Sequence, residues 1–286
     1  MATSMKGKRV IITGASRGIG RDTALALGKM GADLSLIVRD PERGKAVADE
    51  VRAAAGDSSA PDVEVFIADL SSIADVRRVG AEVLAKYDRI DVLVNNAGAL
   101  LMDRQVTKDG YEATFATNHL GYFVLTNVLL DAVKKAPAGR IVNVASEAHR
   151  GGSMKFDDLM GEQKFSGWFA YSASKLANIL FTAELARRLE GTSVTTNCLH
   201  PGVIASGFAH NNKGFVGLLA KLASPFLMSS ENGAKTTIFL ATDPSVATTS
   251  GLYFDKCKPK KPSREARDAA VAKRLWDVSE ELIAGL

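Results

Sequence analysis

A glycine-rich turn between a short apolar segment and an amphipathic segment constrains this chain more than any other feature. The apolar segment Arg9–Thr13 leads directly into the heptapeptide GASRGIG, which starts at Gly14 and ends at Gly20. A turn this tight requires residues without Cβ, both for a positive φ and to let a pyrophosphate approach the backbone. The helix expected over Gly18–Met30 then offers unpaired N–H groups and its positive dipole end to phosphate groups. This context predicts a nucleotide-binding loop, with a merely structural turn as the alternative.

Short apolar segments alternate with longer amphipathic segments along the rest of the chain. The expected strands are Arg9–Thr13, Leu34–Val38, Val63–Ile67, Ile90–Val94, Arg140–Val144 and Val194–Leu199. The expected helices are Gly18–Met30, Glu42–Ala55, Ile73–Tyr87, Gly110–Lys135 and Tyr171–Leu189. Apolar strands separated by helices are typical of a parallel sheet that is covered on both faces. Because no internal repeat or low-complexity linker interrupts the pattern, we expect a single α/β domain over residues 1–286 with a doubly wound parallel sheet.

Composition excludes several other classes of protein. Of the 286 residues, 46% are hydrophobic and 24% are charged, as in an average globular protein. The two cysteines and four dispersed histidines predict neither a disulfide framework nor a metal site. The net charge of +4 lies partly in residues 256–267, which we interpret as a solvated basic loop and not as a nucleic-acid-binding surface. The chain shows no apolar run of the roughly 18 residues that span a membrane and no signal peptide, so we expect a cytoplasmic location.

Further motifs follow in order, each after an expected strand or inside an expected helix. They are Asp69-Leu70, the tetrapeptide NNAG at Asn95–Gly98, Asn118, Ser146, the YxxxK pair Tyr171 and Lys175, and Pro201-Gly202. Together with Thr13 and the G-x-x-x-G-x-G turn, these motifs resemble the short-chain dehydrogenase/reductase family over roughly residues 9–206. The resemblance implies a Rossmann-type fold. It also implies an enzyme that transfers a hydride between a nicotinamide dinucleotide and a carbonyl or alcohol carbon.

The resemblance also indicates which residues bind the dinucleotide. They are Gly14, Ser16, Arg17, Gly18, Ile19 and Gly20 in the turn, then Asp69, Leu70, Asn95, Ala97 and Gly98, then Tyr171 and Lys175, and finally Pro201, Gly202, Val203 and Ser206. The coenzyme is decided at the end of the second strand, where Arg39 and Asp40 are adjacent. A guanidinium at this point binds the 2′-phosphate of NADP(H), whereas a carboxylate repels it and binds the 2′-hydroxyl of NAD(H). Arg39 comes directly after the strand, so we expect NADP(H), with NAD(H) as the alternative.

Four residues are implied as catalytic by the same resemblance: Tyr171, Lys175, Ser146 and Asn118. Tyr171 would give its phenolic proton to the carbonyl oxygen. Lys175, one helical turn further on, would lower the pKa of that phenol and bind the nicotinamide ribose. Ser146 would hold the substrate oxygen, and Asn118 would orient a water molecule that links Lys175 to solvent. Taken singly, each has a structural alternative, such as a capping serine or an ordinary helix asparagine.

The distance between Ser146 and Tyr171 along the chain, 25 residues, is longer than in many members of the family. The extra stretch His149–Trp168 is expected beside the substrate cleft, and the spacing resembles the retinol dehydrogenase-like branch. The stretches Lys175–Phe181, Glu184–Leu189 and Arg274–Val278 also resemble that branch. An apolar segment at about residues 207–228 is expected to form a substrate lid, with a membrane-touching surface as the alternative. A helical extension is expected at about residues 264–284.

The expected function is NADP(H)-dependent hydride transfer to or from an apolar aldehyde, ketone or secondary alcohol, such as a retinoid, steroid or xenobiotic. One alternative is an NAD(H)-dependent enzyme of the same fold. Another is a non-catalytic dinucleotide sensor, which the Tyr171–Lys175 pair disfavours. A third is a sugar-nucleotide epimerase, which the spacing of the glycine turn disfavours. The resemblance also implies a homodimer or homotetramer that assembles through the helices at residues 110–135 and 171–189.

Overall fold

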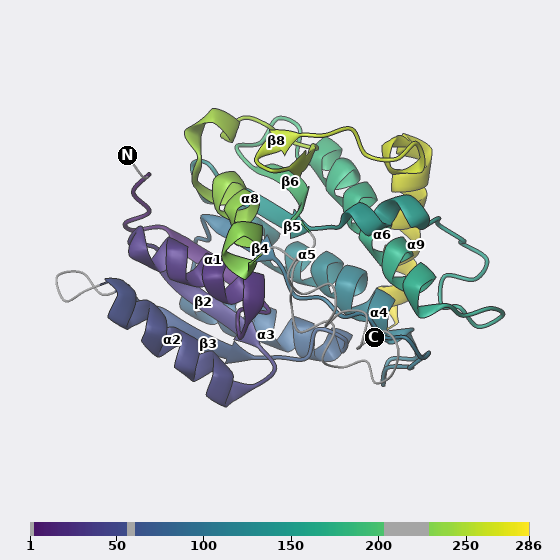
Figure 1. Ribbon diagram of the computed structural model, residues 1–286, viewed down its shortest axis with the longest axis horizontal. Coiled ribbons are helices and arrows are strands. Elements are labelled where there is room, and N and C mark those ends of the chain that lie inside the picture. The colour runs from purple at the N-terminus through teal and green to yellow at the C-terminus, as the bar shows by residue number, and fades with distance from the viewer. Residues whose placement is uncertain (1–2, 56–60, 203–228, 286) are drawn as a thin grey trace.

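The computed structural model describes residues 3–55, 61–202 and 229–285, which form one α/β domain. Its centre is an eight-stranded sheet in the order β3-β2-β1-β4-β5-β6-β7-β8 (Figure 1). The strands are β1 Arg9–Thr13, β2 Asp33–Val38, β3 Val63–Ile67, β4 Val92–Asn95, β5 Arg140–Val144, β6 Thr195–His200, β7 Tyr253–Asp255 and β8 Lys258–Pro259. Strands β1 to β7 run parallel, and β8 pairs antiparallel with β7. This mostly parallel sheet with helices on both faces confirms the predicted fold class.

Helices cover both faces of the sheet because successive strand residues point to opposite sides. On β1, Val10 and Ile12 belong to one buried apolar cluster and Ile11 belongs to the other. The first cluster is shared with α1, α2 and α8, and the second with α3, α5, α6 and α9. These helices are α1 Gly18–Lys29, α2 Pro41–Ala55, α3 Ile73–Lys86, α5 Gly121–Lys134, α6 Gly167–Arg188, α8 Ser230–Thr242 and α9 Ala269–Ala284.

The long helix predicted over Gly110–Lys135 begins later and is irregular. Its first turn is α4 (Ala113–Phe115), which is followed by a π-helical turn η1 (Ala116–Leu120) and then by α5. Gly110 has a φ of +86°, which lies outside the helical region, so the helix cannot include it. The helix starts after Glu112, whose carboxylate accepts hydrogen bonds from the first backbone N–H groups of α4.

Two strands after the predicted six extend the sheet, and they correct the interpretation of residues 256–267 as a solvated loop. β7 and β8 form a hairpin whose two turn residues, Lys256 and Cys257, have φ values of 49° and 59°. Two-residue hairpin turns of this kind usually contain asparagine, aspartate or glycine, so the sequence carried no signal for it. The same stretch also contains β8 and a short helical turn, η6 (Glu265–Arg267).

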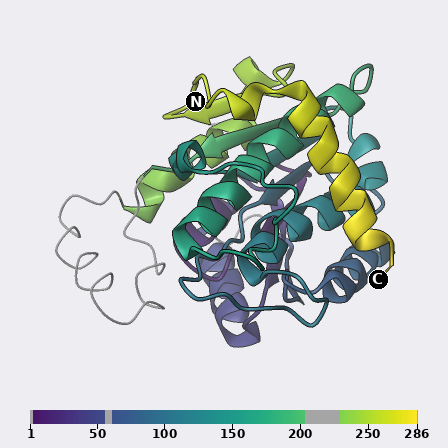
Figure 2. The same cartoon turned by 90° about the vertical axis from the view of Figure 1, so that its right-hand side faces the viewer.

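The C-terminal helix α9 packs along α6, and its Trp276 side chain reaches α5 (Figure 2). Its Trp276 ring lies 4.8 Å from the ring of Phe123 on α5 and 5.8 Å, stacked, from the ring of Phe181 on α6. Aromatic pairs at these distances contribute about 0.5–1.5 kcal/mol each beyond the apolar area that they bury. The helix therefore completes the apolar core on this side of the sheet, in the region where a helical extension was predicted.

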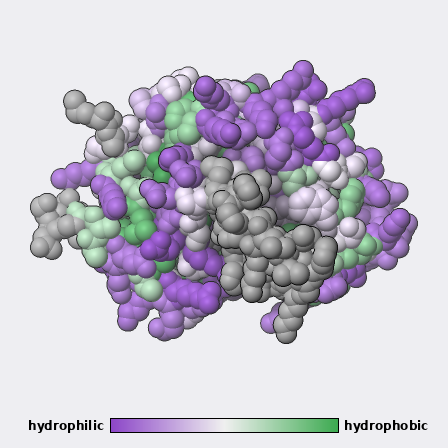
Figure 3. All heavy atoms as spheres, in the orientation of Figure 1, coloured by the Kyte–Doolittle hydropathy of each residue, from purple (hydrophilic) through white to green (hydrophobic). Residues whose placement is uncertain are grey.

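The face of the molecule in Figure 3 is mostly hydrophilic, with small apolar patches between charged side chains. None of the helices within the described ranges combines the length and the apolar character that crossing a membrane requires. The apolar side chains of the helices instead face the sheet, where most of them are buried.

Candidate active site

The glycine-rich turn between β1 and α1 is held against the loop that follows β4. Gly14 has a φ of +67°, and a Cβ added to it would lie 2.7 Å from the Cα of Ala97. The hydroxyl oxygen of Thr13 accepts hydrogen bonds from the backbone N–H groups of Asn96 and Ala97, at 2.9 and 3.0 Å. The side-chain amide of Asn96 donates to the carbonyl oxygen of Thr13 at 2.8 Å. The two motifs therefore fix each other, and Asn96 is a site residue that the sequence analysis did not single out.

The N-terminus of α1 opens at this turn and has the properties of an anion site. Arg17 occupies the N-cap position without a side-chain hydrogen bond to the helix, and the first turn contains no acidic residue. A Cβ on Gly20 would lie 2.4 Å from the carbonyl oxygen of Gly14, so only glycine allows the backbone to turn this tightly. Ser16, Arg17 and Ile19 are not buried, and their backbone lies at the helix start. Helix N-terminal N–H groups and the helix dipole attract phosphate, so this cradle fits the pyrophosphate of a dinucleotide.

The residues after β3 and β4 divide into exposed and buried ones. Asp69 is exposed at the end of β3, and its carboxylate accepts the backbone N–H of Ser71 at 3.0 Å. Leu70 is buried beside it. The buried side chain of Asn95 donates to Thr126 Oγ1 and to Asn143 Oδ1, at 3.0 and 2.8 Å. Asn95 therefore joins β4 to α5 and β5 through its side chain, which points into the core.

Tyr171 and Lys175 share one face of α6, one helical turn apart. The Nζ of Lys175 lies 5.8 Å from the centre of the Tyr171 ring and donates a hydrogen bond of 2.9 Å to the carbonyl oxygen of Val144. Lys175 is almost completely buried, and burial lowers its pKa to about 7. A lysine of this kind exchanges protons near neutral pH, as a proton-relay group must.

Ser146 follows β5 and faces Tyr171 across the site. A hydrogen bond between the two side chains lowers the pKa of Tyr171, but burial of the ring raises that pKa by more. Lys175 is expected from the sequence to lower the pKa of this phenol. In the structure, burial is the largest influence on both groups: it raises the pKa of Tyr171 and lowers the pKa of Lys175.

Asn118 lies in the π-helical turn η1, a type of irregularity that is frequent at functional sites. Its side-chain amide donates to the carbonyl oxygen of Ala99 and to Ser174 Oγ, at 2.9 Å each, and its Oδ1 accepts the backbone N–H of Ala99 at 2.7 Å. A Cβ on Gly98 would lie 3.3 Å from Oδ1 of Asn118 and 3.4 Å from Nζ of Lys175. Asn118 therefore fixes the loop after β4 beside the lysine.

Arg39 and Asp40 have different surroundings after β2. Arg39 is exposed. Asp40 turns toward α2, where its carboxylate accepts the backbone N–H of Arg43 at 3.1 Å and forms an ion pair of 3.1 Å with the Arg43 side chain. Asp40 thus serves as a local cap for α2, and its charge is already paired.

The loop after β6 is only partly described. Pro201 and Gly202 follow β6, and Gly202 has a φ of +91°, which favours glycine. The expected cofactor residues Val203 and Ser206 and the expected lid at about residues 207–228 lie outside the described residues.

An exposed apolar rim borders the site on the side of the stretch His149–Trp168. Trp168, at the start of α6, is 55% exposed, and its ring lies 5.9 Å from the ring of Tyr171. Met102 is 39% exposed, and a Cβ on Gly167 would lie 2.5 Å from the Cα of Met102, so the two segments are in contact. The sequence analysis placed this stretch beside the cleft without identifying Trp168 as a wall of it.

The turn, the Ser146–Tyr171–Lys175 cluster and the parallel sheet define a class of dinucleotide-dependent oxidoreductase. The family model described as short chain dehydrogenase matches residues 8–215, and the chain belongs to the short-chain dehydrogenase/reductase family. It is 42% identical to retinol dehydrogenase 12 of Mus musculus over 277 residues, which cover 97% of this chain and 86% of the relative. The chain therefore belongs among oxidoreductases that act on alcohols or carbonyls, and the resemblance to the retinol dehydrogenase-like branch is confirmed.

Solved structures share the fold of this chain. An uncharacterized protein from Mycobacterium Paratuberculosis is 34% identical, with a TM-score of 0.79 over 99% of this chain and 96% of its own. A short chain dehydrogenase from Escherichia coli CFT073, complexed with NADPH, has a TM-score of 0.67 over 89% of this chain and 98% of its own. At 24% identity, that second likeness concerns the fold alone.

Proposed function

We propose that this protein is an NADP(H)-dependent oxidoreductase that interconverts an apolar alcohol with its aldehyde or ketone. The observation that carries the proposal is the meeting of Ser146, Tyr171 and Lys175 at the carboxyl end of the sheet. The glycine cradle at the N-terminus of α1 opens at the same edge. In parallel α/β sheets this edge is where ligands bind.

The residues of the chain divide the work of reduction among them. The dinucleotide, when bound, supplies the hydride, so the protein must orient the carbonyl and deliver one proton. Ser146 holds the carbonyl oxygen by a hydrogen bond, and Tyr171 donates its phenolic proton to that oxygen. Lys175, with a pKa of about 7, is suited to restore the proton to Tyr171. Asn118 holds the loop at Ala99 through its side chain. A relay from Lys175 to solvent through a water molecule stays a prediction.

The choice of NADP(H) is supported by the charges at the end of β2. Asp40 is paired with Arg43, whereas Arg39 is exposed beside the site, and Arg17 adds a second exposed cation. A 2′-phosphate would therefore meet guanidinium groups, to which it can bond in bidentate fashion. NAD(H) is the alternative coenzyme.

An apolar substrate is supported by the rim of the site. Trp168 exposes apolar surface beside Tyr171, and Met102 exposes apolar surface next to Gly167, the neighbour of Trp168. Such surface in a binding site favours apolar ligands. The similarity to a retinol dehydrogenase supports a retinoid-like substrate, and a steroid-like or xenobiotic substrate is the alternative. A dinucleotide sensor without turnover is disfavoured, because a sensor has no need of a buried Lys175 beside Tyr171.

The predicted homodimer or homotetramer and the cytoplasmic location stay predictions. Because α9 packs on α6, a second subunit that docked on α6 would also contact α9. Sedimentation of the purified protein measures the number of subunits directly.

A panel of carbonyl compounds, with the oxidation of NADPH followed by absorbance, tests the proposed function. We expect turnover of large apolar aldehydes or ketones at higher kcat/KM than of small polar ones. Absence of turnover for the whole panel in both directions, despite binding of NADPH, would contradict an enzymatic role and favour a sensor.

A further inference from the structure

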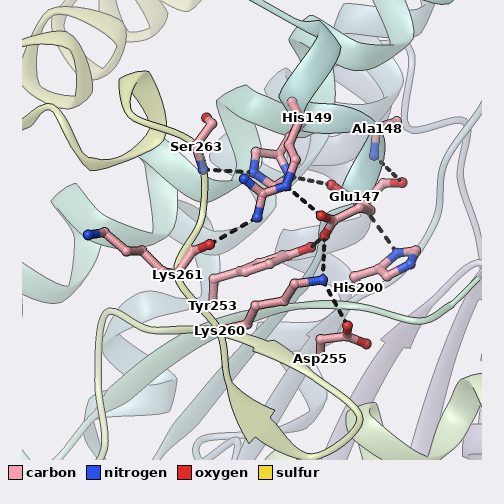
Figure 4. A network of polar contacts seen from close by, with 11 residues as sticks. Glu147, Ala148, His149, His200, Tyr253, Asp255, Lys260, Lys261 and Ser263 are labelled. Carbon is pink, nitrogen blue, oxygen red and sulfur yellow. Dashed lines mark hydrogen bonds and ion pairs between the residues drawn. The ribbon is translucent and has the colours of Figure 1, made fainter.

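We infer that His149 and His200 are positioning residues, which together clamp the peptide group between Ser146 and Glu147 and so aim the Ser146 hydroxyl at Tyr171. The inference rests on the proposed function, because that function assigns the substrate oxygen to Ser146. The clamp lies in the polar network of Figure 4, around the helical turn η2 (Glu147–Gly151) that follows β5.

The direction of the Ser146 hydroxyl depends on the turn that follows it. Its Oγ accepts a hydrogen bond of 3.2 Å from the backbone N–H of Ala148, and it also shares a hydrogen bond with the side chain of Tyr171. Because Ala148 belongs to η2, any rotation of this turn moves the donor and therefore the hydroxyl. Contacts that fix the turn thus fix the serine.

One peptide group of the turn is held at both of its polar atoms. The carbonyl oxygen of Ser146 lies 2.7 Å from Nδ1 of His149, and the backbone N–H of Glu147 donates to Nδ1 of His200 at 3.2 Å. These two atoms belong to the same planar peptide unit. Two imidazole rings from different parts of the chain therefore fix its plane.

The partners of His149 define its tautomer. The carbonyl oxygen of Ser146 can only accept a hydrogen bond, so Nδ1 carries the proton. Nε2 lies 3.1 Å from the backbone nitrogen of Ser263, which can only donate, so Nε2 carries none. The ring is neutral and fully buried, and it connects the turn after β5 to the loop after β8.

The hairpin β7–β8 supports the same turn from the other side. The carboxylate of Glu147 accepts the hydroxyl of Tyr253 at 2.9 Å and pairs with Lys260 at 3.1 Å, and Lys260 also pairs with Asp255 at 3.0 Å. Figure 4 shows Tyr253 and Lys260 reaching Glu147, with Asp255 on the far side of Lys260. These contacts connect the clamp to the hairpin β7–β8. They give the hairpin a role in the site, although it lies outside the sequence motifs of the site.

A matched pair of substitutions at His149 separates its two hydrogen bonds. In His149→Asn, the side-chain amide takes the place of Nδ1–H and keeps the bond to the Ser146 carbonyl, while the bond to Ser263 is lost. In His149→Gln, the longer side chain places its oxygen where Nε2 was, so it keeps the bond to Ser263 and loses the one to Ser146. Both variants lose the edge contact of the ring with Tyr253, so that loss cancels in the comparison.

We expect His149→Gln to lower kcat by about 10-fold or more while the Kd for NADPH changes by less than about twofold, since small misplacements of reacting groups slow chemistry strongly. His149→Asn is expected to retain kcat within about threefold by restoring the bond to the serine carbonyl. At the other end of the clamp, His200→Asn keeps an acceptor for the Glu147 N–H, and His200→Leu removes it. We therefore expect His200→Asn to retain kcat and His200→Leu to lower it.

Equal losses in the Asn and Gln variants of His149, or no loss in either, would overturn the inference, because the ring would then act only as a buried side chain. Hydrogen exchange of the Ala148 amide provides a readout that needs no substrate. Faster exchange in His149→Gln than in His149→Asn supports the clamp, and equal exchange contradicts it. If the wild type turns over no compound of the panel, the proposed function fails, while the exchange measurement still decides the inference.

Discussion

The Nζ of Lys175 on α6 donates a hydrogen bond of 2.9 Å to the carbonyl oxygen of Val144, the last residue of β5. Ser146 stands two residues beyond this carbonyl, so the contact ties the helix that carries Tyr171 to the strand that leads to the serine. The side-chain amide of Asn178 donates to the same oxygen at 3.3 Å. The proposed catalytic side chains are therefore parts of one packed unit, which is what a site that must hold a near-attack geometry requires.

Replacement of Tyr171 by phenylalanine removes the proposed proton donor without changing the packing of the ring. We expect kcat to fall by at least about 10²-fold, the usual contribution of a positioned general acid, with NADPH affinity and the fold retained. Initial rates and a fluorescence titration with NADPH measure the two effects. Tyr87→Phe is the matched control. Tyr87 caps the C-terminal end of α3, away from the site, so this variant should keep its turnover. Near-normal turnover of Tyr171→Phe would show that another group donates the proton.

Lys175→Met tests the cost of burying an amine. Burial lowers the pKa of Lys175 from 10.5 to about 7. Between these two values the unfolded chain binds the proton and the folded one does not, so the stability of the wild type rises with pH across this window. The methionine variant lacks this dependence.

We therefore expect the melting temperature of Lys175→Met to lie several degrees above that of the wild type at pH 6. For a protein of this size, each kcal/mol of stability shifts the melting temperature by about 2–4 °C. The difference should shrink as the pH approaches 10, where the unfolded lysine also begins to lose its proton. Thermal scans of both proteins without dinucleotide, at several pH values, measure it. A difference that does not change with pH would mean that the amine is well solvated. Turnover should be lost in the variant at every pH.

Gly20→Ala tests the glycine cradle. The added Cβ would lie 2.4 Å from the carbonyl oxygen of Gly14 and 2.5 Å from Nδ2 of Asn96, so the turn must shift away from its partner loop. We expect NADPH affinity to fall by about 5- to 150-fold, because close contacts of this kind cost on the order of 1–3 kcal/mol. Gly285→Ala, where an added Cβ meets nothing within 4 Å, is the control. Unchanged NADPH binding in Gly20→Ala would place the dinucleotide elsewhere.

The parts of the fold that the sequence predicted well are those decided by local patterns. Strands β3 and β5 have the predicted bounds, Val63–Ile67 and Arg140–Val144, because each is a short apolar run between polar residues. Helix α2 starts at Pro41, where a missing N–H costs nothing. Helix α6 starts at Gly167, before the predicted start at Tyr171. Its capping residue is Ser166, which lies inside the extra stretch His149–Trp168.

The parts that could not be predicted depend on contacts between distant residues. Glu147 and His200 are 53 residues apart in the chain, and His149 and Ser263 are 114 apart. Nothing in the local sequence around either histidine distinguishes it from a surface histidine. The π-helical turn at Asn118 has no signal in the sequence either. It shifts the helix by one hydrogen-bond register, and this shift changes the spacing of the apolar residues too little to be detected.

At the end of β2, Arg39 and Asp40 offer opposite charges to the 2′ position of the coenzyme's adenosine ribose. Because Asp40 is paired with Arg43, we expect Arg39 to bind the 2′-phosphate. Hydrogen bonds to charged groups contribute about 1.5–3 kcal/mol, which corresponds to a preference of roughly 10- to 150-fold for NADPH over NADH. Arg39→Ala should reduce the ratio of the two kcat/KM values by about this factor and leave kcat/KM for NADH nearly unchanged. Asp40→Asn is the control. It removes the ion pair with Arg43 but keeps a side chain that can cap α2, and the ratio should stay within about twofold. A wild type that prefers NADH, or a ratio that Arg39→Ala does not change, would refute the assignment of Arg39 to the phosphate.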